Sequence, residues 1–180
     1  KRRNFGNIFG HVKGIDDMSS LSDWVTSQFD PSLDWKDVSE IRSIWDGKLI
    51  LKGIMDREDA IAAVQAGADA IVVSNHGGRQ LDGTISSIDA LPRILDVVGN
   101  KCEVWMDGGI RSGQDILRAV ALGATGTLIG RAFLYGLGAS GQNGVCQTLE
   151  ILRKELDLTM GLCGLKNLAD VDKSILYQYQ

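Results

Sequence analysis

Four short segments of the chain are rich in apolar residues: KLILKG at 48–53, AIVVSNHG at 70–77, EVWMDGG at 103–109 and GTLIG at 126–130. Apolar runs of this length are typical of strands that are buried on both faces, and they favour a parallel sheet. Each run is followed by a stretch in which apolar residues recur at helical spacing. The pattern therefore predicts four βα units in succession.

Capping residues mark where three of these helices begin. Asp56 stands before the first, while Ser86 with Asp89 and Ser112 with Asp115 form capping-box patterns before the second and third. Such side chains accept hydrogen bonds from the free N–H groups of a first helical turn. Further helices are expected at 20–28, 35–46 and 141–161.

Helices followed by four βα units fit either a doubly wound open sheet or half of a (β/α)8 barrel, which takes eight such units in about 250 residues. We favour an α/β fold that is the C-terminal half of a (β/α)8 TIM barrel. Residues 1–47 then form a loop and helical lead-in, and residues 48–180 form the last four βα units. Because half a barrel has unpaired strand edges, we expect it to expose apolar surface.

Composition and charge argue against several classes of protein. With 44% hydrophobic and 23% charged residues the chain can build a core, and its net charge of −4 argues against a nucleic-acid partner. No apolar run reaches the roughly 18 residues of a membrane-spanning helix, and no signal-peptide pattern is present. The three cysteines lack disulfide or metal spacing. We therefore expect a cytoplasmic protein with reduced thiols, and a peripheral contact with the inner face of the cell membrane stays open.

Polar residues follow all four predicted strands at the point where each strand ends. Lys52 closes the first, Ser74 and His76 close the second, Asp107 closes the third, and Arg131 follows the fourth. In parallel α/β folds, the carboxyl ends of the strands are where sites are built. The polar strand ends therefore predict one site at a common edge of the sheet.

The third and fourth strand ends predict a phosphate site. Gly108 and Gly109 leave the backbone open to an anion, and Arg111 follows them. Gly130 and Arg131 repeat the pairing of glycine with arginine on the next strand. Two guanidinium groups suit a phosphate. We also expect the helix after the third strand to point its positive end toward the same place.

The first and second strand ends carry groups suited to substrate chemistry. A lysine that closes an apolar strand is costly to bury without an anion, so we expect Lys52 to lie against a cofactor that becomes negative during turnover. His76 can exchange a proton near pH 7, and Arg79 can hold a carboxylate through two parallel hydrogen bonds. Gly77 and Gly78 keep the space between them open. A base beside a carboxylate clamp suits chemistry at the carbon next to that carboxylate.

The motifs SNHGGRQLD, MDGGIRSGQD and GRAFLYGLGA resemble the FMN-dependent α-hydroxy acid dehydrogenase/oxidase family, and the resemblance covers nearly the whole chain. The most similar branch is that of the bacterial, quinone-linked L-lactate dehydrogenases. The resemblance implies FMN as cofactor and oxidation of an (S)-2-hydroxy acid to a 2-oxo acid, with L-lactate to pyruvate as the expected reaction. Electrons would then pass to a quinone, to oxygen or to a cytochrome.

The resemblance also implies roles for individual residues. His76 is the expected catalytic base, and it takes its proton either from the substrate hydroxyl or from the α-carbon. Arg79 is expected to bind the substrate carboxylate, while Lys52 and Ser74 contact the flavin ring. The ribityl chain and phosphate of FMN are assigned to the two glycine–arginine strand ends, that is to Asp107, Gly108, Gly109, Arg111, Gly130 and Arg131.

The family's first four strands have no counterpart in this sequence. With them go a tyrosine that contacts the carboxylate and the aspartate that orients the catalytic histidine. We therefore expect the chain alone to be poorly active, to need the N-terminal half of the barrel as a partner, and to form a homo-oligomer when complete. The opening KRRNFGN is interpreted as a boundary within a longer chain, and the second histidine, His11, as part of a surface loop.

Three other functions stay open at this point. One is oxidation of glycolate or lactate with oxygen as the acceptor. Another is a different phosphate-binding barrel enzyme, such as IMP dehydrogenase, type 2 isopentenyl diphosphate isomerase or glutamate synthase, although none of these is expected to carry SNHGGRQ. The third is a half-barrel that binds phosphate or another chain without catalysis.

Overall fold

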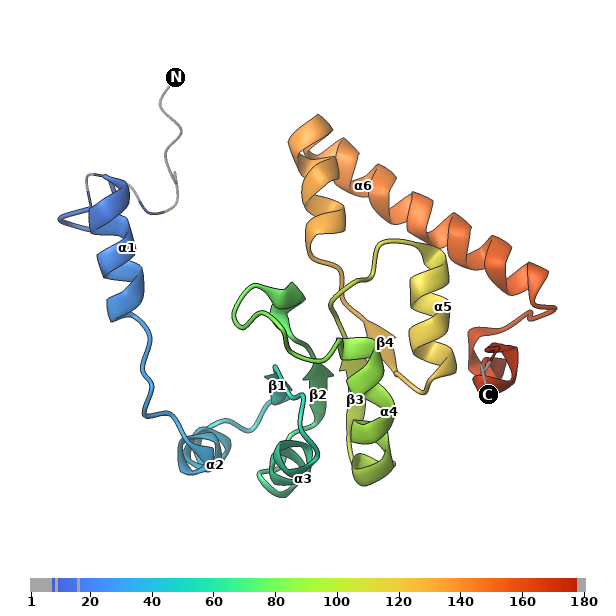
Figure 1. Cartoon of the computed structure of the whole chain (residues 1–180), viewed down its shortest axis with the longest axis horizontal. Coiled ribbons are helices and arrows are strands. Elements are labelled where there is room, and N and C mark those ends of the chain that lie inside the picture. The colour runs from blue at the N-terminus through green and yellow to red at the C-terminus, as the bar shows by residue number, and fades with distance from the viewer. Residues whose placement is uncertain (1–7, 9, 16, 178–180) are drawn as a thin grey trace. The chain divides into compact units, whose positions relative to one another are not determined.

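The computed structural model describes residues 8, 10–15 and 17–177, and it divides into two compact units, 1–37 and 38–180 (Figure 1). In the first unit, α1 (Met18–Ser27) begins at a capping box that Asp17 forms with Ser20. The helix α2 (Trp35–Ile44) spans the boundary between the units. The exposed His11 lies in a turn, as the sequence predicts.

The second unit contains a sheet of four parallel strands. These are β1 (Ile50–Lys52), β2 (Ala70–Val73), β3 (Glu103–Met106) and β4 (Gly126–Thr127), and each pairs with the next in chain order. A doubly wound sheet would reverse its strand order at a switch point. The sequential order β1-β2-β3-β4 is that of four consecutive units of a (β/α)8 barrel.

The helices that follow the strands begin where the capping residues predict. They are α3 (Arg57–Gln65) after Asp56, α4 (Ser87–Val98) after Ser86, and α5 (Gly113–Ala121) after Ser112. α3 packs against α4, and α5 packs against α6 (Arg131–Leu162). Single 3-10 turns lie at His76–Gly78, Leu168–Asp170 and Lys173–Ile175. Within the described residues, the structure contains no helix with the length and apolar character that a membrane span requires.

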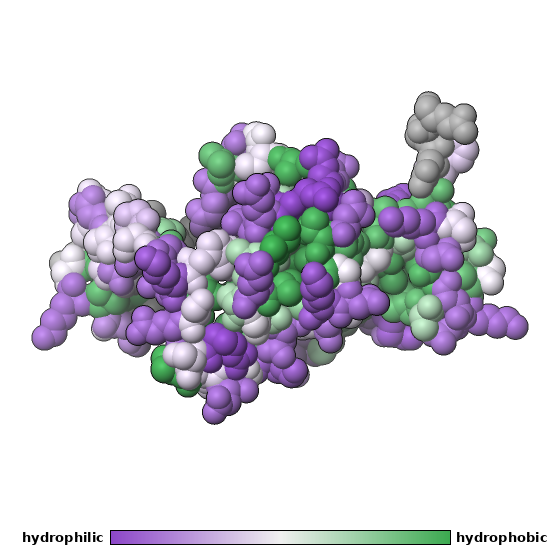
Figure 2. All heavy atoms as spheres, turned by 90° about the horizontal axis from the view of Figure 1, so that it is seen from below, coloured by the Kyte–Doolittle hydropathy of each residue, from purple (hydrophilic) through white to green (hydrophobic). Residues whose placement is uncertain are grey.

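Burial differs sharply between the strands. All four residues of β2 are buried, and Ile71 and Val73 are fully inaccessible to solvent. β1 is exposed at Ile50, whose accessible fraction is 43%, because the outer edge of β1 has no neighbouring strand in the described part of the chain. Trp45, just before this edge, is also exposed. Figure 2 shows apolar surface lying among charged side chains on the face seen from below.

The strands end earlier than the sequence predicts. β2 stops at Val73 rather than at residue 77, because His76, Gly77 and Gly78 have φ angles of 55°, 66° and 70°, which no strand can contain. β3 likewise stops at Met106, before the two glycines that follow Asp107. The site residues that follow β2 and β3 are therefore carried by tight turns beyond the strand ends.

The last helix begins earlier than predicted. The sequence indicates a helix at 141–161, but α6 starts at Arg131 and is broken by non-helical backbone at Ser140 and Gly141, where the ribbon bends sharply (Figure 1). Gly136 and Gly144 lie in contact across this bend. A Cβ on either glycine would collide with the carbonyl oxygen of the other, so neither position has room for a side chain. Glycine is a poor helix former, so close packing rather than propensity stabilises the first segment.

Candidate functional site

A cavity of about 940 Å³ opens at the carboxyl ends of the strands. Its lining includes residues from all four strand ends, together with apolar side chains of the first segment of α6, Leu134 and Tyr135. Nine of the ten predicted site residues line it: Lys52, His76, Arg79, Asp107, Gly108, Gly109, Arg111, Gly130 and Arg131. The tenth, Ser74, is buried behind them.

Lys52, Ser74 and Asp107 form a hydrogen-bonded cluster at the base of the cavity. The Lys52 ammonium donates to Ser74 Oγ at 2.9 Å and lies 3.1 Å from Asp107 Oδ2. Ser74 Oγ also accepts the backbone N–H of His76 at 3.1 Å. Asp107 Oδ1, in contrast, is buried and has no hydrogen-bond partner among the described residues. A buried acceptor without a partner costs about 1–3 kcal/mol, so this oxygen is suited to a donor from a ligand.

The turn at residues 74–79, which we call the His76 turn, holds its central histidine in an unusual conformation. His76 is the one described residue other than glycine with a positive φ, at 55°. Asn75 Oδ1 accepts the N–H of Gly77 at 3.0 Å, which closes the turn. A left-handed conformation costs about 1–3 kcal/mol outside glycine and is commonest at functional sites. The exposed His76 side chain is thereby presented at the cavity wall.

The turn at residues 107–110, which we call the Asp107 turn, is open at Gly109. A Cβ added to Gly109 would meet no atom within 4 Å, and the same holds for Gly130 on the next strand end. Arg131 Nη2 donates to Gly77 O at 3.3 Å, so its guanidinium bridges toward the His76 turn. Arg111 contributes a second, exposed guanidinium to the same cavity.

Carboxylates accept the N–H groups just before α5 and that of its first residue, which differs from what the sequence suggests. Asp115 Oδ2 accepts the N–H groups of Arg111 at 3.1 Å and Ser112 at 3.0 Å. Glu155, from α6, accepts the N–H of Gly113 at 2.9 Å. Two carboxylates thus lie at the helix end that the sequence was expected to point toward a phosphate.

The N-terminus of α6 is the open one. Its N-cap, Gly130, forms no side-chain capping hydrogen bond, and Gly130, Arg131 and Ala132 all line the cavity. Uncapped N–H groups at a helix start are donors for an anion, and the helix dipole adds to the attraction. The start of α6 therefore offers N–H donors to an anion in the cavity, without a side-chain cap.

The charge in the cavity opposes that of the whole chain. Lys52, Arg79, Arg111 and Arg131 line the cavity with a single carboxylate, Asp107, although the chain has a net charge of −4. The Arg79 and Arg111 side chains form no hydrogen bond or ion pair with the part of the chain that the structure describes. A concave surface lined by unpaired cations attracts anionic ligands such as phosphates and carboxylates.

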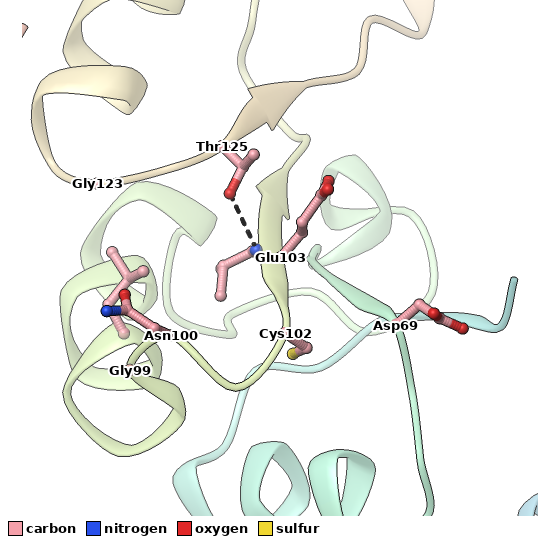
Figure 3. A pocket seen from close by; sticks show the side chains of 9 residues that line it. Asp69, Gly99, Asn100, Cys102, Glu103, Gly123 and Thr125 are labelled. Atoms are coloured by element: carbon pink, nitrogen blue, oxygen red, sulfur yellow. Dashed lines mark hydrogen bonds between the residues drawn. The ribbon is translucent and has the colours of Figure 1, made fainter. Parts of the chain in front are cut away.

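A second pocket, of about 380 Å³, lies at the opposite, amino ends of β2 and β3. Its polar side chains point in different directions, as Figure 3 shows for Asp69, Asn100 and Glu103. Burial, together with the charge of Glu103, raises the pKa of the Cys102 thiol, so the thiol stays neutral and is a poor nucleophile. The chemistry is therefore concentrated at the carboxyl ends of the strands.

Sequence reasoning missed two polar residues that hold the site together. Asn75 closes the His76 turn, and the buried Ser87 on α4 accepts the N–H of Asn75 at 3.1 Å. An asparagine two residues before a glycine is a recognisable sign of a turn closed by the asparagine side chain. Nothing local to Ser87 distinguishes it from the capping Ser86 beside it.

The sequence matches the FMN-dependent dehydrogenase family over residues 5–178. The chain belongs to this family. It is 51% identical to an L-lactate dehydrogenase of Caulobacter sp. (strain K31) over 173 residues, which are 96% of this chain and 45% of that relative. It is 47% identical to an L-lactate dehydrogenase of Serratia proteamaculans (strain 568), over 99% of this chain and 47% of that relative.

Solved structures agree with the fold. A mandelate oxidase is 46% identical with a TM-score of 0.80, over 86% of this chain and 45% of that chain. Mandelate oxidase with (S)-4-hydroxymandelic acid gives 47% identity and a TM-score of 0.81, over 85% of this chain and 43% of that chain. The predicted fold, the C-terminal half of a TIM barrel, is confirmed, and so is the predicted cofactor class, since the family is FMN-dependent. The chain spans about half the length of the curated relatives it matches.

Proposed function

We propose that this chain forms the cofactor- and substrate-binding half of an FMN-dependent 2-hydroxy acid dehydrogenase, with L-lactate as substrate and pyruvate as product. The observation that carries the proposal is that His76, Arg79 and Lys52 line one cavity together with the glycine–arginine strand ends. The similarity to L-lactate dehydrogenases supports the choice of substrate.

The residues present fit FMN on three independent points. The unpartnered Asp107 Oδ1 needs a donor, which a ribityl hydroxyl would provide. The open backbone at Gly109 and Gly130 leaves room for a phosphate beside Arg111 and Arg131. The Lys52 ammonium, which is 45% exposed at its side chain, is near enough to Ser74 for both to contact one edge of a flavin ring.

FMN, when bound, would take up the two electrons that the substrate loses. The chain's own residues would bind the substrate and move its proton. Arg79, whose guanidinium is unpaired, would hold the substrate carboxylate through two parallel hydrogen bonds. His76 would act as the base, and its left-handed backbone would keep the imidazole at the cavity wall. A proton from the hydroxyl and one from the α-carbon are both within the chemistry of this base.

The electron acceptor and the partner half of the barrel belong to the same proposal. We infer a quinone as acceptor in a cytoplasmic enzyme, with a peripheral contact at the inner face of the membrane as an extension of it. The exposed outer edge of β1 supports a requirement for the N-terminal half of the barrel, and assembly into a homo-oligomer would follow its completion. The isolated chain should then turn over L-lactate poorly.

The test is an anaerobic titration of the complete barrel with L-lactate, D-lactate, glycolate and L-mandelate while the flavin absorbance is followed. The proposal predicts bleaching by L-lactate at the lowest concentration, with pyruvate formed in equal amount. Reoxidation by a quinone faster than by oxygen would support the dehydrogenase assignment, and the reverse would favour an oxidase. Absence of bleaching by every acid in the panel would rule out the proposed function.

A further inference from the structure

Ser87, the first residue of α4, occupies a position between the two turns that form the cavity. Its accessible fraction is 1%, and its hydroxyl accepts the N–H of Asn75 at 3.1 Å. Ser87 does not cap α4, because Ser86 does so through the N–H of Asp89. Its hydroxyl therefore bonds to the His76 turn, 12 residues away in sequence, rather than to its own helix.

The Asp107 turn rests against the same two side chains. A Cβ added to Gly108 would lie 2.9 Å from Ser87 Oγ and 3.0 Å from Asn75 Oδ1. The backbone of Gly108 is thus packed directly onto the hydroxyl and the amide that fix the His76 turn. Because protein interiors are close-packed, a change in volume at this contact moves its neighbours.

The two turns carry different parts of the candidate site. The His76 turn presents His76 and Arg79 to the cavity, and the Asp107 turn presents Asp107, with Arg111 directly after it. The contact through Ser87 is located on the side of both turns that faces α4. Its geometry therefore determines how far the groups expected to handle the substrate lie from those expected to hold the cofactor.

We propose that Ser87 is a positioning residue for this site: its hydroxyl fixes the His76 turn against the Asp107 turn and so sets the spacing between substrate and cofactor groups. The contact through Ser87 is seen in the structure, whereas its effect on substrate and cofactor spacing rests on the proposed function. Ser87→Ala removes the acceptor of the Asn75 N–H without adding volume. The N–H group is then left unpaired, and both turns gain freedom to move.

The neighbouring serine supplies a matched control. Ser86→Ala makes the same chemical change one residue earlier, and it removes the cap of α4 without removing a bond to either turn. A loss of stability in α4 alone would appear in both variants. An effect on the two turns should appear only in Ser87→Ala.

The first measurement is backbone amide NMR and hydrogen exchange on the 180-residue chain. Ser87→Ala should increase amide exchange at Asn75 by about tenfold, the loss expected for one ordinary hydrogen bond, and should shift the amide signals of Gly77 and Gly108. The chain has two histidines, so the ring signals of His76 should move while those of His11 stay in place. Equal spectra for the two turns in Ser87→Ala and Ser86→Ala would overturn the proposal.

The second measurement is the affinity of the same variants for FMN. Ser87→Ala should raise the dissociation constant of FMN by about three- to tenfold, and Ser86→Ala should leave it within twofold of the parent. Displaced turns with unchanged FMN affinity would overturn the positioning role. If the parent sequence fails to bind FMN even within the complete barrel, the proposed function is wrong, and the assignment of Ser87 is then decided by the amide signals alone.

A double-mutant cycle tests the packing contact directly. Gly108→Ala introduces a Cβ against Ser87 Oγ, and Ser87→Gly removes that oxygen. If the contact couples the two turns, Gly108→Ala should disturb the amide signals of the His76 turn less in the Ser87→Gly background than in the parent. Additive effects of the two substitutions would contradict the coupling.

Discussion

The two ends of the sheet use charge in opposite ways. At the amino ends, Asp69 accepts from the Lys48 ammonium at 2.6 Å and from the N–H of Leu49 at 2.9 Å, and lies 3.5 Å from Arg42. The hydrogen bond from Lys48 is the largest cause that lowers the pKa of Asp69. At the carboxyl ends, four cations face one cavity with a single carboxylate, and one oxygen of that carboxylate has no partner in the described residues.

The charged groups at the amino ends stabilise the fold, whereas those at the carboxyl ends are arranged to bind a ligand. At the amino end the charged groups satisfy one another, and little attraction is left for a ligand. At the carboxyl end the buried Asp107 Oδ1 without a partner and the left-handed His76 backbone are unfavourable in the free protein, and such costs persist where a ligand or a reaction uses them. Substitutions at the carboxyl ends should therefore lower ligand binding or activity, and substitutions at the amino ends should lower stability.

The largest expected effect is that of replacing the proposed catalytic base, His76. His76→Asn in the complete barrel should lower kcat for L-lactate by about 10²- to 10⁴-fold, the usual contribution of a general base, while FMN affinity stays within twofold. Steady-state kinetics with a flavin titration measure both. His11→Asn, which changes the exposed histidine of the lead-in, is the control and should leave kcat unaltered.

The next effect concerns the phosphate. Arg131→Ala should weaken FMN binding by about 10- to 100-fold, since hydrogen bonds to a charged group contribute about 1.5–3 kcal/mol. Riboflavin, which lacks the phosphate, should bind both proteins alike in a fluorescence titration. Arg153→Ala removes a guanidinium that is paired with Glu150 outside the cavity, and it should change neither affinity. Equal losses for FMN and riboflavin would place the phosphate elsewhere.

How far the sequence predicts this site depends on how local each cause is. The four βα units follow from apolar runs and capping residues, which are local signals. The early end of β2 is not local, because the backbone of His76 is held by Ser74 and Asn75 within a turn that Ser87 supports from α4. The hydrogen bond at the start of α5 is even harder to predict from the sequence, since its acceptor, Glu155, lies 42 residues beyond Gly113.

The first segment of α6 is a second feature that local sequence patterns do not predict, because it depends on packing. The predicted helix at 141–161 leaves this segment out, and its two glycines are poor helix formers, while Gly136 packs closely against Gly144 in the structure. That segment carries Gly130 and Arg131 at its start, so a feature that local patterns miss supplies the open helix end of the candidate phosphate site. The residue types of the site could be predicted, but the helix that assists them could not.

A smaller effect compares two glycines of the Asp107 turn. Gly108→Ala and Gly109→Ala both force a left-handed φ on alanine, at 86° and 90°, but only Gly108 would also press a Cβ against Ser87 and Asn75. Gly108→Ala should therefore be less stable than Gly109→Ala by about 1 kcal/mol, the lower end of the usual cost of overpacking. Urea unfolding of the two variants measures the difference. Equal stabilities would mean that the turn is not packed on α4.

The smallest effect lies at the amino end and depends on pH. The pKa of Asp69 is lowered in the folded chain, so its ion pairs stabilise the fold above its unfolded pKa, and this contribution is lost as the pH falls through the folded value. Asp69→Asn should be less stable than the parent at neutral pH, and the difference should shrink below about pH 4. Thermal unfolding across pH measures it, and FMN affinity should not change. A difference independent of pH would show that charge is not its cause.

The most direct test of the contrast between the two ends is to titrate the 15N-labelled chain with FMN and map the amide shifts. The account predicts saturable shifts at Gly109, Gly130 and Arg131, at the carboxyl ends of the strands, and unchanged signals at Cys102 and Thr125, at the amino ends. Shifts centred on Cys102 and Thr125, or no saturable shift at any of the five positions, would contradict it.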